Sequence, residues 1–207
     1  MLKKLKLGLL LLCLPLSAMA AQFEVGNQYT VIRAAKTPAP EVKEFFSFYC
    51  PHCFKFETVA HAIEANLPAN VEFEKSHVNF LGGISRESQS NITKAYLVAK
   101  KHGKDKAITE QIFQTIHLKN NQLTNVNIIR ELFRLNDIDN VTFDSDWNSK
   151  TINDQANDML KSQQRYSKLG ALTGVPTFIV NGKYKINHNV ISDQTELNEL
   201  IDYLLKL

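Results

Sequence analysis

Two cysteines separated by two residues are the part of this sequence best suited to chemistry. The motif Cys50-Pro51-His52-Cys53 directly follows the aromatic stretch 41–49 and precedes a helical pattern. Two sulfurs at this spacing can close a small disulfide and open it again, because a thiolate both attacks and leaves in disulfide exchange. The motif therefore predicts a redox site at the start of a helix.

The two sulfurs are expected to differ. Cys53 begins an apolar stripe at helical spacing, continued by Phe56, Ala60, Ile63 and Leu67, so its side chain should be buried. Cys50 stands at the helix start, where Pro51 suits the first turn and unpaired N–H groups favour a thiolate. His52 adds positive charge when protonated. A lowered thiol pKa stabilises the reduced pair, which makes the disulfide oxidising.

Three other interpretations of the pair are open. A structural disulfide at this spacing would add little stability, because the loop it closes is very short. A zinc site would recruit His52, His61 or His77, but the sequence has neither a second cysteine pair nor a matched histidine pair. The pair could also be inert. The strand-to-helix placement favours the redox interpretation, and we predict no metal.

The first twenty residues have the layout of a secretory leader. Three lysines precede an apolar run at 7–16, and Ala18-Met19-Ala20 follows it. We predict a signal peptide, residues 1–20, cleaved after Ala20. The alternative, a membrane anchor, would need roughly twenty apolar residues. Export would place Cys50 and Cys53 in an oxidising compartment and remove the third cysteine, Cys13.

Charge and length narrow the classes of partner and fold. The chain of 207 residues has 24 Lys and Arg against 21 Asp and Glu, and without the three leader lysines the two totals are equal. A near-neutral mature chain is not expected to bind nucleic acid or anionic lipid as its main partner. The length suits one domain, or one domain with a large insertion.

The apolar patterns predict an α/β fold with a block of helices inside it. Residues 41–49 and 71–80 read as strands on either side of the helix that follows Cys50, which predicts parallel pairing. The chain is helix-like from 85 to 169. Strand patterns return at 176–180 and 183–186 around Asn181-Gly182, a strong hairpin signal, and a last amphipathic helix follows.

Three stretches together resemble the DsbA family of periplasmic thiol:disulfide oxidases. They read EFFSFYCPHC, EKSHVNF and GVPTFIVNGKY, and the likeness runs over nearly all of 21–207. It implies a thioredoxin fold with an inserted all-helical domain, with thioredoxin-like parts at 21–83 and 170–207 and the insertion at 84–169. An oxidising pair with a low thiol pKa is a known property of that family, so the argument from the helix start agrees with a known case.

The resemblance also implies a substrate-binding segment. Pro176 falls where the family has a cis-proline facing the disulfide, and the backbone of Val175 would pair with an extended substrate. From the residues alone, a proline that opens a strand needs no function.

Two charged residues match those that the family places beneath the cysteine pair. These are Glu44 and Lys75, and a buried carboxylate there is a candidate proton acceptor for Cys53. Without the family, either side chain could equally extend to solvent at a strand end. Glu57 also matches a family acid, but we expect a solvated helix charge. His61 and His77 are expected to be surface or packing residues.

Taken together, the sequence predicts a monomeric periplasmic enzyme that donates disulfides to reduced secreted polypeptides and needs no bound cofactor. The resemblance implies reoxidation by a membrane quinone reductase of the DsbB type. Two alternatives stay open: a reductase or isomerase on the same fold, and a peptide-binding folding factor with a vestigial cysteine pair.

Overall fold

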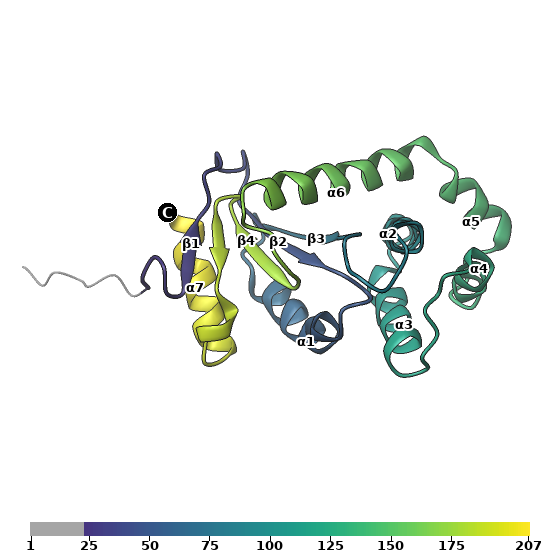
Figure 1. Ribbon diagram of the computed structural model, residues 1–207, viewed down its shortest axis with the longest axis horizontal. Helices are drawn as coiled ribbons and strands as arrows, with labels where there is room; N and C mark the ends of the chain where they lie inside the picture. Colours follow the sequence, from purple (N-terminus) through teal and green to yellow (C-terminus); the bar gives the residue numbers. More distant parts are fainter. Residues whose placement is uncertain (1–22) are drawn as a thin grey trace, which may run out of the picture.

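A mixed five-stranded sheet forms the centre of the molecule (Figure 1). The computed structural model describes residues 23–207, so the predicted leader lies outside the described residues. The strands run in the order β1-β5-β4-β2-β3. Their bounds are β1 Tyr29–Val31, β2 Glu41–Phe46, β3 Glu72–His77, β4 Thr177–Val180 and β5 Tyr184–Ile186. β2 and β3 pair in parallel, which confirms the prediction, and the other pairs are antiparallel.

Helices cover both faces of the sheet. On one face, α1 (Pro51–Asn66) and α7 (Gln194–Lys206) bury Val42 and Phe178 in a common core. On the other face lies the long helix α6 (Lys150–Lys168), which crosses above the sheet in Figure 1. This arrangement follows from the two-residue period of the strands, because successive side chains of β2 point to opposite faces.

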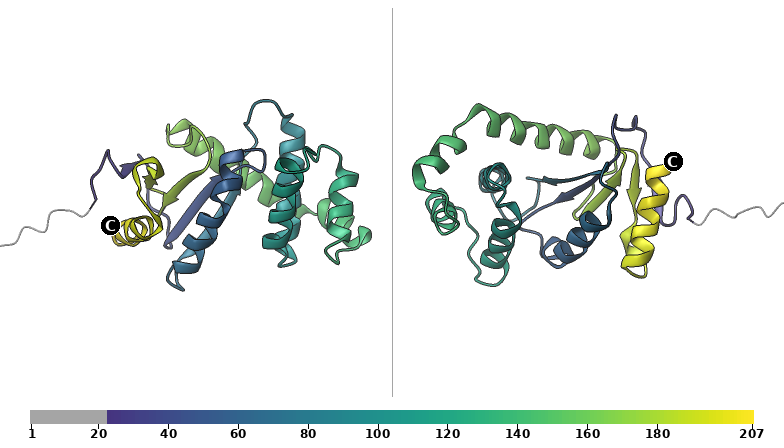
Figure 2. Two further views of the ribbon diagram at one scale, coloured as in Figure 1. Left: turned by 90° about the horizontal axis from the view of Figure 1, so that it is seen from below. Right: turned by 180° about the vertical axis from the view of Figure 1, so that it is seen from behind.

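The remaining helices stand beside the sheet, at the end away from α7 (Figure 2). They are α2 (Arg86–Lys101), α3 (Asp105–His117), α4 (Val126–Arg134) and α5 (Asn140–Trp147). Short polar side chains fix several helix starts by accepting a backbone N–H: Ser85 for α2, Asn125 for α4, Asp139 for α5, Ser149 for α6 and Asp193 for α7. The predicted helix-like block is thus five helices, α2 to α6, with capped breaks between most of them.

One apolar core joins these helices to the sheet. Phe113 of α3 lies 4.9 Å from Phe48 and 6.3 Å from Phe46 between ring centroids. The same cluster of buried residues includes both Cys50 and Cys53. Packing between the helical group, α2 to α5, and the sheet therefore surrounds the cysteine pair.

Three strands differ from the sequence prediction. The strand expected at 41–49 ends at Phe46, where the turn before Cys50 begins. The strand expected at 71–80 ends at His77, because N–H groups beyond Val78 donate to helix side chains: Asn79 N to Gln163 Oε1 and Leu81 N to Gln89 Oε1. The edge strand β1 was not predicted, since three residues are too few to show a period.

Candidate active site

The sheet and α1 together position Cys50. β2 ends at Phe46, a tight turn follows, and Cys50 is the residue that caps α1, with Pro51 in its first turn. Cys50 is 7% exposed and Cys53, one turn into the helix, is fully buried. Both are free thiols in this structure. The expected difference between the two sulfurs in access is present.

The two thiols also differ in acidity. The pKa of Cys50 is lowered to about 6, first because the Cys53 side chain donates a hydrogen bond to its sulfur. Burial opposes this effect, whereas the backbone N–H groups of Cys53 and His52 and the charge of His52 reinforce it. The pKa of Cys53 is raised far above its usual value by that same hydrogen bond and by burial. Cys50 is therefore the sulfur that ionises.

A segment distant in sequence, around Val175, lies against the Cys50 sulfur. The Cys50 thiol donates to the carbonyl oxygen of Val175 at an Sγ···O distance of 3.4 Å. The Val175–Pro176 peptide bond is cis, as the resemblance implied. The loop that contains these residues leads into β4, which pairs with β2 and so brings positions 50 and 175 together.

A groove of about 500 Å³ opens along this loop. Its walls come from His52 and Phe56 of α1, from residues 173–177, and from Thr30 and residues 185–189. His188 stands edge-on to the Phe56 ring at 5.0 Å. Burial, Lys185 and His52 together lower the pKa of His188. The groove therefore places the backbone of Val175 beside the exposed imidazole of His52.

A buried ion-pair network lies beneath the cysteines. β2 and β3 place Glu44 opposite Lys75, whose Nζ lies 3.3 Å from Glu44 Oε2. Lys75 also binds both carboxylate oxygens of Glu57 at 2.7 Å. The expectation that Glu57 is a solvated charge is therefore wrong: Lys75 reaches it from β3. His61, one turn further along α1, lies 3.1 Å from Glu57.

Burial sets the acidity of the network. Glu44 has no exposed surface, and desolvation raises its pKa to about 7 despite the opposing charge of Lys75. The Glu44 charge is among the causes that raise the pKa of Cys53. For Lys75, burial lowers the pKa, but the two carboxylates outweigh it and the net shift is upward. Glu44 is thus a carboxyl group that can change protonation near neutral pH close to the inner thiol.

His77 is a packing residue, as expected. It is buried, its Nδ1 lies 2.8 Å from Thr93 Oγ1, and its ring stacks on Phe48 at 5.2 Å. Residues 23–207 contain no group of three or more side chains suited to holding a metal ion. No helix in that range is long and apolar enough to cross a membrane.

Comparison with known proteins agrees with this geometry. The family model described as the DSBA-like thioredoxin domain matches residues 41–204. The chain belongs to the DSBA-like thioredoxin family. The thiol:disulfide interchange protein DsbA of Escherichia coli strain K12 is 37% identical over 188 residues, which cover 89% of this chain and 86% of that protein.

Solved structures of DsbA proteins have the same fold. The Pseudomonas aeruginosa DsbA crystal structure aligns with a TM-score of 0.75 at 26% identity, covering 89% of this chain and 93% of its own. A Proteus mirabilis DsbA variant with a non-covalently bound peptide, PWATCDS, aligns with a TM-score of 0.79 at 28% identity, covering 90% and 100%. The predicted thioredoxin fold with added helices and the predicted thiol:disulfide oxidoreductase activity are both confirmed for this DSBA-like chain.

Some residues around the site were missed in the sequence. His117 of α3 lies with Nε2 2.8 Å from the Phe48 carbonyl oxygen, and its ring stacks on Phe54 at 5.1 Å. It therefore supports the turn before Cys50 in this DSBA-like fold. His188 in the groove was also missed. Neither histidine lies near the cysteines in sequence, so no local spacing could have identified them.

Proposed function

We propose that the chain donates its Cys50–Cys53 disulfide to secreted polypeptides. A substrate thiolate attacks the Cys50 sulfur, so that a substrate–Cys50 bond forms and Cys53 leaves with the electron pair. A second substrate thiolate then attacks the substrate sulfur and displaces Cys50. Two electrons pass from the substrate dithiol to the enzyme, whose cysteines end reduced.

The difference in acidity between the two thiols is the observation that supports this direction. A thiolate at Cys50 with a pKa near 6 is a good leaving group and stabilises the reduced enzyme. Pro51 starts the helix whose N–H groups favour that thiolate, and His52 adds charge beside it. A reductase would instead need a pair whose disulfide is the more stable form.

Glu44 and Lys75 supply a route for the proton of Cys53. When Cys53 leaves it must gain a proton, and it must lose one again when the pair is reoxidised. Glu44 sits close enough to raise the pKa of Cys53 and has its own pKa near 7. In this proposal Glu44 exchanges the proton, and Lys75 keeps the carboxylate from being too costly to ionise.

Val175 and Pro176 form the substrate-binding segment in this proposal. The Val175 carbonyl already accepts a hydrogen bond from the Cys50 thiol, so a peptide strand aligned with it would bring a cysteine to the Cys50 sulfur. The Proteus mirabilis relative was solved with a non-covalently bound peptide that contains a cysteine, which supports peptide binding by a protein of this fold.

The compartment and the reoxidising partner are part of the same proposal. The predicted leader at 1–20 would export the chain, as a monomer, to the periplasm. There a membrane quinone reductase of the DsbB type would accept the two electrons, since the chain itself has no nucleotide or haem motif. The boundaries 21–83, 84–169 and 170–207 remain predicted units of the chain.

Thiolate titration and trapping test the proposal together. The absorbance of the reduced protein at the thiolate band should titrate with a midpoint near pH 6, and Cys50→Ser should remove that transition. Cys53→Ser should accumulate a mixed disulfide when its Cys50 thiolate attacks a cysteine peptide supplied as a disulfide with glutathione, because glutathione leaves as the thiolate and the inner thiol that would displace the peptide from Cys50 is gone. A midpoint near that of free cysteine, together with mixed disulfides on Cys53 in Cys50→Ser, would contradict the proposal.

The same variants separate the alternatives. A folding factor with a vestigial pair would assist the folding of a cysteine-free client as well after Cys50→Ser as before. A reductase would show an equilibrium with glutathione that favours its disulfide form, whereas an isomerase would restore a client with scrambled disulfides without net oxidation. The proposed oxidase should be largely reduced in the same mixture.

A further inference from the structure

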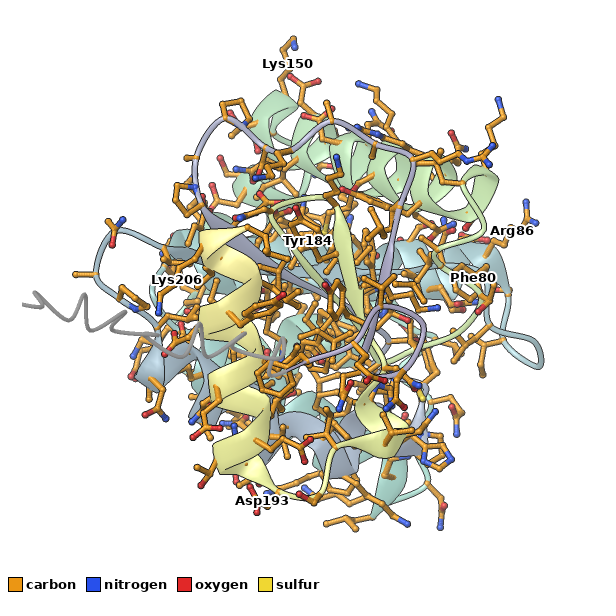
Figure 3. All side chains as sticks on the ribbon, turned by 90° about the vertical axis from the view of Figure 1, so that its left-hand side faces the viewer. Phe80, Arg86, Lys150, Tyr184, Asp193 and Lys206 are labelled. Carbon is orange, nitrogen blue, oxygen red and sulfur yellow. The ribbon has the colours of Figure 1, made fainter. Side chains whose placement is uncertain are left out.

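A large cavity of the described chain lies away from the cysteines. It has a volume of about 1030 Å³ and opens between residues 33–35, the second half of α6, Phe80 and residues 172–173. Figure 3 shows Phe80 beneath the ribbon of α6, on the side of the molecule opposite Lys206. This volume is at the upper end of the range of small-molecule sites.

All charged residues that line this cavity are basic. They are Arg33, Lys161, Arg165 and Lys168, and the lining contains no carboxylate. Lys161 is held by Asp158, at 2.8 Å on the exposed side of α6. Arg33 and Lys168 have no ion pair with any residue in 23–207. A cleft lined by one sign of charge concentrates ligands of the other sign.

The floor of the cavity is apolar. Ala34, Phe80 and Leu172 belong to the cluster that packs between the sheet and α6, and Leu169 is 39% exposed at the cavity rim. A floor of this kind favours an apolar body over a fully hydrated anion such as phosphate. A ligand that satisfies both parts of the lining needs an anionic head and an apolar tail.

We propose that this cavity, named here the α6 cavity, binds a free single-chain amphiphile with an anionic head group. The head group contacts Arg33 and Lys168, and the tail lies on Phe80 and Leu169. The site is separate from the peptide groove, with which it shares only Thr173. The cavity is an open groove along α6, and its apolar floor, bordered by basic side chains, suits the single tail and anionic head of a monomeric amphiphile.

Laurate below its micelle-forming concentration is the probe for this proposal. Isothermal titration calorimetry should show saturable binding of one laurate to the full protein. The double variant Arg33→Gln/Lys168→Gln should weaken that binding by about tenfold or more, since each lost charge contact contributes roughly 0.7 kcal/mol or more. The matched control is Lys119→Gln/Lys206→Gln, which removes the same charge from exposed sites elsewhere and should change the affinity by less than about twofold.

Three further measurements can overturn the proposal. Amide chemical-shift changes on adding laurate should centre on 33–35 and 161–172, and changes centred on 185–189 would place the ligand in the peptide groove instead. Equal affinity for dodecyltrimethylammonium would show that the basic residues play no part. Sedimentation of the wild-type protein, but not the double variant, with phosphatidylglycerol vesicles would make the surface a membrane contact and contradict the cavity site.

Discussion

Glu44 is a carboxyl group with no exposed surface and no hydrogen bond of good geometry to either oxygen among the described residues. Its nearest charge is Lys75, at 3.3 Å. Burial destabilises the ionised carboxylate more than the charge of Lys75 stabilises it, so the pKa of Glu44 is raised to about 7. The Glu44 carboxyl group therefore titrates at a higher pH in the folded protein than in the unfolded chain. This difference predicts the direction in which stability changes with pH.

The stability of the Glu44→Gln variant relative to the wild type should increase as the pH rises. Between about pH 4.5 and pH 7 the folded state holds a proton on Glu44 that the unfolded state has lost, so the wild-type protein loses stability as pH rises through this window. A glutamine side chain does not ionise, so it makes no such pH-dependent contribution to stability. The free energy of unfolding of the variant, relative to the wild type, should therefore increase by about 3 kcal/mol from pH 4 to pH 8. Urea unfolding at both pH values measures it.

Glu57→Gln is the control for this experiment. Glu57 binds the same lysine and its charge is one of the causes that raise the pKa of Glu44, so its substitution should weaken the network and give a smaller pH-dependent gain than Glu44→Gln. A difference between Glu44→Gln and wild type that does not change between pH 4 and pH 8 would show that Glu44 ionises normally in the folded protein.

For single residues, the sequence predicts which side chains lie near the site better than it predicts which of them contact one another. The sequence singles out the cysteine pair, Glu44, which is fully buried, and Pro176, whose peptide bond is cis. Glu57 was judged wrongly because spacing along α1 shows which helix face it occupies, but not that Lys75 of β3 reaches that face. His117 and the Val175 carbonyl meet the site from distant segments, and only the assembled fold brings them there.

The β4–β5 hairpin turns through two residues in the left-handed region. Asn181 has φ +49° and Gly182 φ +65°, as the predicted two-residue turn requires. Gly182 is also crowded: a Cβ at this position would lie 2.9 Å from Thr37 Cγ2 and 3.1 Å from the Tyr166 hydroxyl. That hydroxyl donates to the Gly182 carbonyl. The turn is thereby joined to both the residue 37 segment and α6.

Gly182→Ala should destabilise the protein by about 2 to 4 kcal/mol, because it combines a left-handed residue with a steric clash. Gly170→Ala is the matched control. Gly170 has a similar φ of +69°, but a Cβ there would meet nothing within 4 Å, so it should cost only about 1 kcal/mol. Thermal and urea unfolding compare the two. Equal losses would mean that the contacts with Thr37 and Tyr166 do not constrain the turn.

Strands and helices with a clear period were predictable from the sequence. The parallel β2–α1–β3 unit, the hairpin and α7 all lie close to where the apolar spacing placed them. The failures have local causes: β1 is too short to show a pattern, and β3 ends early because Gln163 and Gln89 side chains accept the N–H groups that would have extended it.

The helical group and the sheet should unfold together. Their common core includes Phe46, Phe48 and Phe113, so neither part can open without exposing the other. Trp147 of α5 is the only tryptophan in the chain and reports on the helical group. Its fluorescence should give the same urea midpoint as the far-ultraviolet circular dichroism, which reports on all elements.

Phe113→Ala provides a second arm of that test. Loss of this ring should cost about 3 to 5 kcal/mol and shift both signals equally. A tryptophan transition that precedes the circular dichroism transition would show that the helices unfold as a separate unit.

The two edge strands of the sheet determine whether the protein can pair with other polypeptide chains. One edge is β1, which is only three residues long, and the other is β3, whose sequence contains Glu72, Glu74 and Lys75. Short or charged edge strands are poor templates for pairing with another chain. We therefore expect that neither edge of the sheet pairs with a polypeptide substrate.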